Sequence, residues 1–222
     1  MRACTVFFGN VSVGFIEHLP NGQRQADHIP PPAVGLADRL DTLMGLFAAG
    51  LQPTGTRDPF ALRRSAIGLV QILIDQNLDF DLDWGLRQAA AGLPFSVDDN
   101  LRQACLDFIR VRLEAQLQAE GFDFDVVQAV LIEQARFPAH AKQAVIDLSA
   151  WRKEKGWMEQ LQAFARCARI TRDLEDLGEV DPKLLEEKAA KALHSAVSNA
   201  MKLERRPGSV DDFKQALIGL VP

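Results

Sequence analysis

The sequence predicts an all-α protein built from two helical units. Apolar residues recur at the helical spacing of i, i+3 and i+4 in almost every periodic segment of the 222 residues. Strand-like alternation is weak and confined to residues 5–16. A composition of 47% hydrophobic and 25% charged residues is that of an ordinary globular chain. The chain is long enough for one large domain or two small ones.

The first strong helix lies in AVGLADRLDTLMGLFAAG, residues 33–50. Gly50 is predicted to end it in the left-handed conformation. Asp58 is then predicted to cap the next helix, with Pro59 as its first residue. The apolar stripe of that second helix should enter the core; its residues are Phe60, Leu62, Ala66, Leu69, Val70 and Leu73.

The segment PFSV, residues 94–97, is the predicted domain boundary, because it follows a shorter helical segment and precedes a long one. Two later stretches begin with SVDD, at Ser96 and Ser209, and the spacing of Ser and Asp predicts the same helix-start chemistry at both. Further helical patterns fill the region between them. The last pattern places a continuous apolar face on residues 185–200, as in a bundle helix.

Several classes of function lack support in the composition and spacing. A net charge of −5 means that any nucleic-acid binding must use local basic patches. Cys4, Cys105 and Cys167 form no CxxC pair, and the four histidines are scattered, which argues against a zinc site or a disulfide framework. No apolar run approaches the roughly 18 residues of a membrane span. We therefore expect a cytoplasmic chain that binds neither membrane nor DNA.

The run GLQPTG, residues 50–55, resembles the first half of a phosphate-binding loop. Thr56 and Arg57 stand where that motif requires Lys and Ser or Thr, and the run follows a helix instead of a strand. A plain connection between two helices explains it better. Asp38 and Asp41 could pair for metal or acid–base chemistry, but no histidine cluster accompanies them, and an ion-pair or capping role for Asp38 is favoured. No catalytic residue and no metal ligand is predicted.

The main charge feature is a basic stretch at residues 151–172. It contains six basic residues and only two acids, Glu154 and Glu159, and an acidic run follows at 173–187. The basic residues are Arg152, Lys153, Lys155, Arg166, Arg169 and Arg172. With Trp151 and Trp157 nearby, this stretch could hold an RNA backbone and stack a base. Charge alone slightly favours the alternative, in which the arginines pair with the acidic run on a solvated face.

A resemblance goes further than these patterns. The segment LADRLDTLMGLFAAGLQPTGTRDPFALRRSAIGLVQIL, which begins at residue 36, is similar to the beta subunit of bacterial-type glycyl-tRNA synthetase, including loop residues that packing does not dictate. Four further segments also resemble that family: FIEHLP at 15–20, FIRVRLEAQLQAEGFDFDVVQAVL at 108–131, LQAFARCARITRDL at 161–174 and RRPGSVDDFKQALIGLVP at 205–222. The resemblance covers roughly residues 11–222 and is firmest at 36–74.

The resemblance implies a partnership in the ATP-dependent glycylation of tRNA. The alpha subunit of such an enzyme carries the catalytic site and uses ATP with Mg, while the beta subunit binds tRNA(Gly), so no cofactor is expected on this chain. Residues 1–94 would be the tail of an HD-like helical domain. Residues 95–222 would be a C-terminally incomplete, helical anticodon-binding-like domain. The expected tRNA-binding residues are Arg57, Arg63, Arg64, Arg152, Lys153, Lys155, Arg166, Arg169 and Arg172.

The chain also departs from the family pattern. It is far shorter than a whole beta subunit, residues 1–14 match poorly, and the elements of an HD-type metal site are missing apart from Asp38 and Asp41. We expect a truncated form or fragment of the beta subunit. The alternatives are a free-standing helical RNA-binding or regulatory module, and the non-functional product of a broken reading frame.

Overall fold

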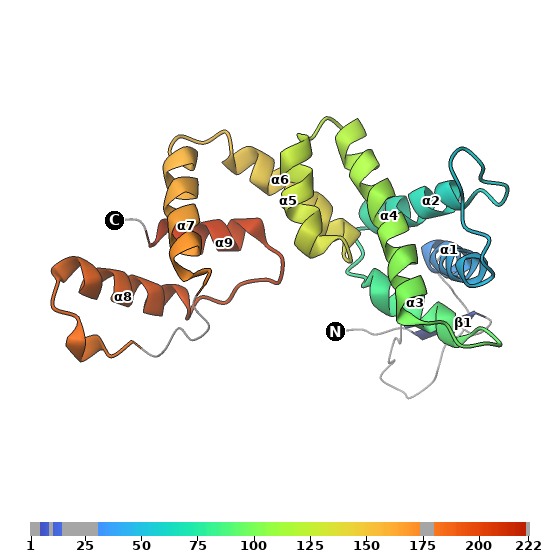
Figure 1. Ribbon diagram of the computed structural model, residues 1–222, viewed down its shortest axis with the longest axis horizontal. Coiled ribbons are helices and arrows are strands. Elements are labelled where there is room, and N and C mark those ends of the chain that lie inside the picture. Colours follow the sequence, from blue (N-terminus) through green and yellow to red (C-terminus); the bar gives the residue numbers. More distant parts are fainter. Residues whose placement is uncertain (1–4, 9–10, 15–30, 174–179, 221–222) are drawn as a thin grey trace, which may run out of the picture. The chain divides into compact units, whose positions relative to one another are not determined.

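The chain is helical, as predicted. The computed structural model describes residues 5–8, 11–14, 31–173 and 180–220, in which the chain forms nine α-helices, a 3₁₀ turn and one hairpin (Figure 1). The helices are α1 (Pro31–Ala48), α2 (Leu62–Asp75), α3 (Leu82–Ala91), α4 (Asp99–Ala119), α5 (Phe124–Gln134), α6 (Pro138–Trp151), α7 (Trp157–Thr171), α8 (Lys188–Ala200) and α9 (Val210–Ile218). Within the described ranges, no helix combines the length and the apolar character that a membrane span requires.

The hairpin falls where the sequence showed its weak alternation. Strands β1 (Thr5–Phe8) and β2 (Val11–Gly14) pair antiparallel, with Thr5 opposite Gly14. The segment FIEHLP at 15–20, which carries part of the family resemblance, lies outside the described residues. The 3₁₀ turn η1 (Pro182–Leu184) precedes α8.

Residues 1–142 form one compact unit, in which α1 packs against α2, α3 and α4. The apolar residues predicted for the first two helices lie in its core, together with residues of α3 and α4: the largest fully buried side chains are Leu36, Leu40, Leu43, Met44, Leu62, Leu69, Leu73, Leu82, Leu86, Ile109, Leu113 and Leu117. Each such side chain contributes about 1.5–3 kcal/mol by leaving water. Phe60 is the exception among the predicted core residues, because it lies before α2 and is 46% exposed.

The end of α1 is confirmed in detail. Gly50 has a φ of +72°, in the left-handed region that favours glycine. Its N–H donates to the carbonyl of Phe47 at 3.0 Å, and the N–H of Leu51 donates to that of Leu46 at 2.9 Å. This pair of hydrogen bonds satisfies carbonyls that the helix end leaves open.

Residues 143–222 form the second compact unit. Its centre is a group of aromatic rings, in which Trp151 contacts Trp157 at a centroid distance of 5.0 Å and Phe213 at 6.4 Å, and Phe164 contacts Phe213 at 6.2 Å. No residue of α7 or α8 is buried. The apolar face expected on residues 185–200 therefore has no buried residue along α8, and Leu193 and Val197 are exposed.

The compact units divide between Lys142 and Gln143, inside α6, and not at 94/95. The physical reason is that α4, which follows residue 95, packs against α1, α2 and α3. Pro94 and Phe95 thus belong to a loop within one unit. The assignment of residues 1–94 to an HD-like domain and of 95–222 to an anticodon-binding-like domain stays a prediction.

Candidate nucleic-acid interface

The predicted site residues lie in both units. Arg57, Arg63 and Arg64 belong to the first, at the loop before α2 and its first turn, and the other six belong to the second. Within the first unit the structure brings the three arginines to one end of α2. In the second, Arg152, Lys153 and Lys155 surround the α6–α7 turn, while Arg166 and Arg169 lie on α7 and Arg172 caps its end.

The loop before α2 is closed by its own backbone. Thr54 and Arg57 form an isolated antiparallel bridge, with N–H···O distances of 3.2 and 2.9 Å, around Gly55, whose φ is +52°. Because these two amides donate to each other's carbonyls, they cannot form a phosphate cradle. The loop is therefore a connection between helices, as the comparison with phosphate-binding loops predicted, and its charge resides in the side chains.

Asp58 does cap α2, although the helix begins later than predicted. Its two carboxylate oxygens accept hydrogen bonds from the N–H groups of Leu62 at 2.8 Å and Arg63 at 3.0 Å. Pro59 is not the first helical residue, because Ala61 takes the left-handed conformation, with φ +55° and ψ +34°, immediately before Leu62. An Asp-Pro pair signals a helix start, but it does not reveal an extra turn between the cap and the helix.

A fourth arginine joins these three, and the sequence analysis missed it. Arg112 of α4 lies over the ring of Phe108, with the guanidinium carbon 3.7 Å from the ring centroid, and it donates to the Phe108 carbonyl at 3.0 Å. The positive charge of Arg63 is near enough to lower the pKa of Arg112, together with the larger effect of burial. The aromatic–arginine spacing of i, i+4 on one helix was the available signal.

In their surroundings these four arginines differ from Arg87, Arg102 and Arg136 of the same unit. Within the described residues no carboxylate lies at ion-pair distance from them, although Asp58 is near Arg112. The buried Asp83 carboxylate, by contrast, pairs with three other arginines: Arg87 at 3.1 Å, Arg136 at 3.3 Å, and Arg102. The arginines around Asp83 are therefore ion-paired, whereas those near the start of α2 have the Asp58 carboxylate nearby but form no ion pair among the described residues.

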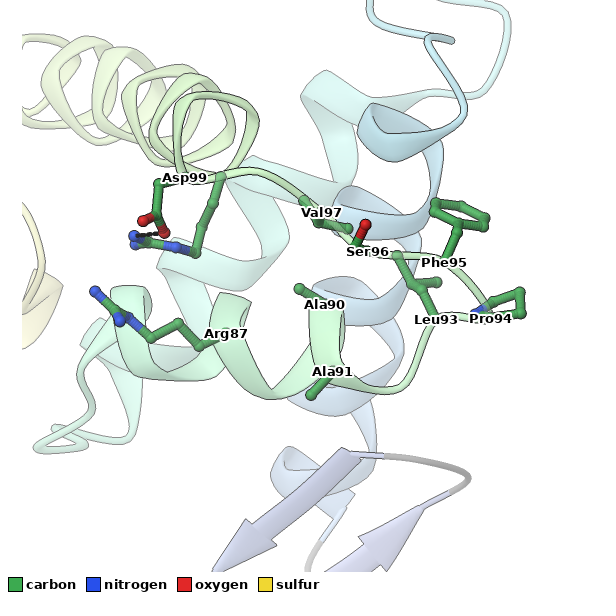
Figure 2. Close-up of a pocket in the computed structure, with 10 residues that line it drawn as sticks. Arg87, Ala90, Ala91, Leu93, Pro94, Phe95, Ser96, Val97 and Asp99 are labelled. Atoms are coloured by element: carbon green, nitrogen blue, oxygen red, sulfur yellow. Dashed lines mark hydrogen bonds and ion pairs between the residues drawn. The ribbon is translucent and has the colours of Figure 1, made fainter.

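A hollow of about 540 Å³ adjoins that neutralised cluster (Figure 2). Figure 2 shows it between α3, the loop at residues 93–97 and the first turn of α4, with Arg87 and Asp99 on one side and Phe95 on the other. Arg102 also lines the hollow, and it pairs with Asp99 at 2.7 Å as well as with Asp83. The hollow thus has no excess of positive charge, so it is a poor site for a phosphate group.

In the second unit, the side chains of Arg166, Arg169 and Arg172, on and just after α7, are all exposed. Arg169 donates to the carbonyl of Ala165 at 3.3 Å. The alternative pairing with the acidic run is not tested, because residues 174–179 lie outside the described part of the chain. Trp151 is not a stacking surface for a base, since it is buried among other rings and donates its indole N–H to Gln160 at 2.9 Å.

The Asp38 and Asp41 carboxylates are electrostatically coupled. Burial, and then the neighbouring charge of Asp38, raise the pKa of the Asp41 carboxyl. Among the described side chains, no group of three or more His, Cys, Asp or Glu residues is arranged to hold a metal ion. The predicted ion-pair or capping role of Asp38 stays a prediction.

The family model described as glycyl-tRNA synthetase beta subunit matches residues 17–132. The chain belongs to this family. Its relatives include the glycine–tRNA ligase beta subunit of Moorella thermoacetica, 39% identical over 182 residues, and that of Pseudomonas aeruginosa, 38% identical over 199 residues. These alignments cover 79% and 85% of this chain but 26% and 28% of the relatives.

A third relative, the glycine–tRNA ligase beta subunit of Acidithiobacillus ferrooxidans, is 38% identical over 164 residues, which are 70% of this chain and 23% of that subunit. The chain thus spans about a quarter of the length of the curated beta subunits that it matches. The region matched by the family model contains Arg57, Arg63 and Arg64 near the start of α2, and also Arg112 of α4. It ends before the basic residues of the second unit.

Proposed function

We propose that this chain corresponds to a tRNA-binding portion of the beta subunit and contributes tRNA(Gly) binding to the ATP-dependent glycylation of tRNA. Membership of the beta-subunit family supports this assignment. In this proposal an alpha subunit supplies the catalytic site and uses ATP with Mg. The present chain supplies recognition within an alpha–beta assembly and carries no complete catalytic site of its own.

The observation that carries the proposal is the group of four arginines near the start of α2, Arg57, Arg63, Arg64 and Arg112, which form no ion pair within the described residues. The net charge of the chain is −5, so a general positive field cannot attract RNA. Arg57 and Arg64 are exposed, and no carboxylate among the described residues neutralises them. Guanidinium groups bind phosphate with two parallel hydrogen bonds, so such a group suits an RNA backbone.

The exposed basic residues of the second unit are a second proposed contact region. Lys153 and Lys155 follow the end of α6, and Arg166, Arg169 and Arg172 project from or cap α7. Arg152 lies at the same turn. These residues come from one unit and the α2 group from the other, so each region is tested by its own variants.

The decisive experiment is a titration of the chain with tRNA(Gly) and with a non-cognate tRNA across a salt series. Phosphate contacts predict that the logarithm of affinity falls linearly with the logarithm of salt concentration for both RNAs. Anticodon reading predicts tighter binding of tRNA(Gly) at every salt concentration. Absence of binding to either RNA at low salt would refute the proposal.

Association with the alpha subunit needs a separate measurement. Co-expression of the chain with an alpha subunit, followed by size-exclusion chromatography, should give a complex that contains both chains. Binding to tRNA without such a complex would support the free-standing RNA-binding module instead. A complex without tRNA affinity would show that this portion of the subunit serves assembly and not recognition.

A further inference from the structure

We propose that Arg63 and Arg112 together bind one phosphodiester group of an RNA backbone, on the surface where α2 packs beside α4. The inference rests on the proposed function and deepens it, because it assigns a contact to a residue that the sequence analysis did not select. The two side chains come from helices that contact each other in the first unit. Three observations lead to this site.

The first observation is that Arg112 is held in place by contacts other than an ion pair. Its guanidinium lies over the Phe108 ring, and one of its N–H groups donates to the Phe108 carbonyl. Phe108 is itself fixed by an edge-on contact with Phe47, at a centroid distance of 5.2 Å. An arginine supported in this way loses little conformational freedom when it binds an anion.

The second observation is that the Arg63 side chain is held by the loop before α2. Its Nη2 donates to the carbonyl of Gly55, which stands inside the turn closed by Thr54 and Arg57. Its backbone N–H donates to the capping Asp58 carboxylate. Both arginines are therefore positioned by their own helices and loops before any ligand arrives.

The third observation is electrostatic. Burial, and then the positive charge of Arg63, lower the pKa of Arg112, so the two guanidinium groups repel each other. Asp58 acts in the opposite direction, but both of its oxygens already accept backbone N–H groups. Within the described residues no carboxylate forms an ion pair with either arginine. A bound anion would remove the repulsion, which makes a shared phosphate favourable.

The hydrogen-bonding capacity fits the same ligand. A guanidinium has five N–H groups, and in the described structure each of these two arginines uses one of them, for a backbone carbonyl. The remaining groups can donate to the two non-bridging oxygens of a phosphodiester. Charge-assisted hydrogen bonds of this kind are about twice as strong as neutral ones.

The test compares tRNA binding by the full chain and by Arg112→Gln, Arg63→Gln and the double variant, using fluorescence anisotropy over a salt series. Each single variant should weaken binding about tenfold at low salt and reduce the magnitude of the salt slope by about one. Because both residues hold the same phosphate, the double variant should lose less than the product of the two single losses. Arg112→Lys should bind tRNA more tightly than Arg112→Gln but less tightly than the wild type, since lysine keeps the positive charge and cannot donate two parallel hydrogen bonds.

Arg110→Gln is the matched control. Arg110 lies two residues away on the same helix and lines a different hollow, together with Asp107 and Glu133. Arg110→Gln changes the net charge by the same amount as Arg112→Gln and should leave the tRNA affinity within about twofold of the wild type and the salt slope nearly unchanged. Thermal unfolding of every variant separates loss of binding from loss of folding.

The outcomes distinguish the two proposals. If the wild-type chain binds no RNA, the proposed function fails and this inference fails with it. If the wild type binds RNA and Arg112→Gln behaves as Arg110→Gln does, only the present inference is overturned. A titration with inorganic phosphate, followed through the Arg112 side-chain NMR signals, tests a free anion as the ligand. Saturation by phosphate without any effect of Arg112→Gln on RNA binding would also overturn the assignment to RNA.

Discussion

Arg136, in the turn between α5 and α6, binds both carboxylate oxygens of Asp81, which caps α3, at 3.1 and 2.5 Å. Asp81 also accepts hydrogen bonds from the N–H groups of Asp83 and Trp84. In return, the carbonyl of Arg136 accepts the N–H of Leu82 at 2.9 Å. Two segments 55 residues apart are thereby joined at the first turn of α3.

Removal of this carboxylate should destabilise the first unit more than removal of the arginine. Asp81→Ala removes the helix cap and the ion pair, which should cost about 1–2 kcal/mol of unfolding free energy. Arg136→Gln keeps the cap and removes the ion pairs of a half-exposed arginine with Asp81 and Asp83, so about 0.5–1 kcal/mol is expected, because Asp83 keeps Arg87 and Arg102 as partners. Urea unfolding followed by circular dichroism measures both, and an equal cost for the two variants would contradict the capping role.

Gly85 allows α3 to approach its neighbours closely. A Cβ atom at this position would lie 2.6 Å from the ring of Phe80 and 3.1 Å from a methyl carbon of Leu40. Gly85→Ala should therefore cost about 1–3 kcal/mol through overpacking, although alanine favours helices. Phe80→Leu in the Gly85→Ala background should restore part of the loss, and a neutral effect of Gly85→Ala would show that the contact relaxes freely.

The sequence was sufficient to predict the apolar faces of α1 and α2, because burial repeats with the helical period and leaves a readable pattern. It was insufficient at the two SVDD stretches. At residues 209–212 the hydroxyl of Ser209 caps α9 and accepts the Asp212 N–H at 3.1 Å. At residues 96–99 Asp98 caps α4 instead, accepting the Leu101 N–H at 2.7 Å. The same four-residue sequence therefore does not determine which of its residues caps the helix, because that depends on the surrounding loop.

The same limitation applies to the candidate site. The arginines before and within α2 were predicted from a family segment that includes loop residues. Arg112 was missed because its proximity to Arg63 depends on the packing of α4 against α2, which brings near each other two residues that are 49 positions apart in the sequence (112 − 63). The compact units divide at 142/143 and not at the predicted 94/95 for a related reason. A Pro-containing loop marks the end of a helix equally well inside a unit and between two units.

Ala61 has the left-handed backbone conformation that L-residues disfavour. Ala61→Gly should therefore stabilise the chain by about 0.5–1 kcal/mol, the relief of strain exceeding the greater entropy of glycine in the unfolded state. Ala104→Gly, at an exposed position inside α4, is the matched control and should destabilise by about 1 kcal/mol. The opposite signs are measured by thermal unfolding, and destabilisation of equal size at both positions would disprove strain at Ala61.

Cys105 and Cys167 should differ in reactivity. Cys105 is fully buried, and burial raises the pKa of its thiol from 9.0 to about 12, whereas Cys167 is exposed on α7. The thiolate is the reactive species, so at pH 8 an alkylating reagent should modify Cys167 rapidly and Cys105 only on unfolding. Peptide mass spectrometry over time measures each rate. Comparable rates at the two positions would contradict the burial of Cys105.

The same thiol predicts a pH dependence of stability. Because the folded-state pKa lies above the unfolded value, the contribution is fully present below pH 9.0 and is lost as pH rises from 9.0 towards about 12. The loss should approach about 1.4 kcal/mol per pH unit within that window. Cys105→Ala removes this contribution and leaves the titration of the lysines and of the other thiols in place. The wild type should therefore lose more unfolding free energy than Cys105→Ala between pH 8 and pH ~10.5, and parallel pH profiles would show that the Cys105 thiol ionises as readily in the folded chain as in the unfolded one.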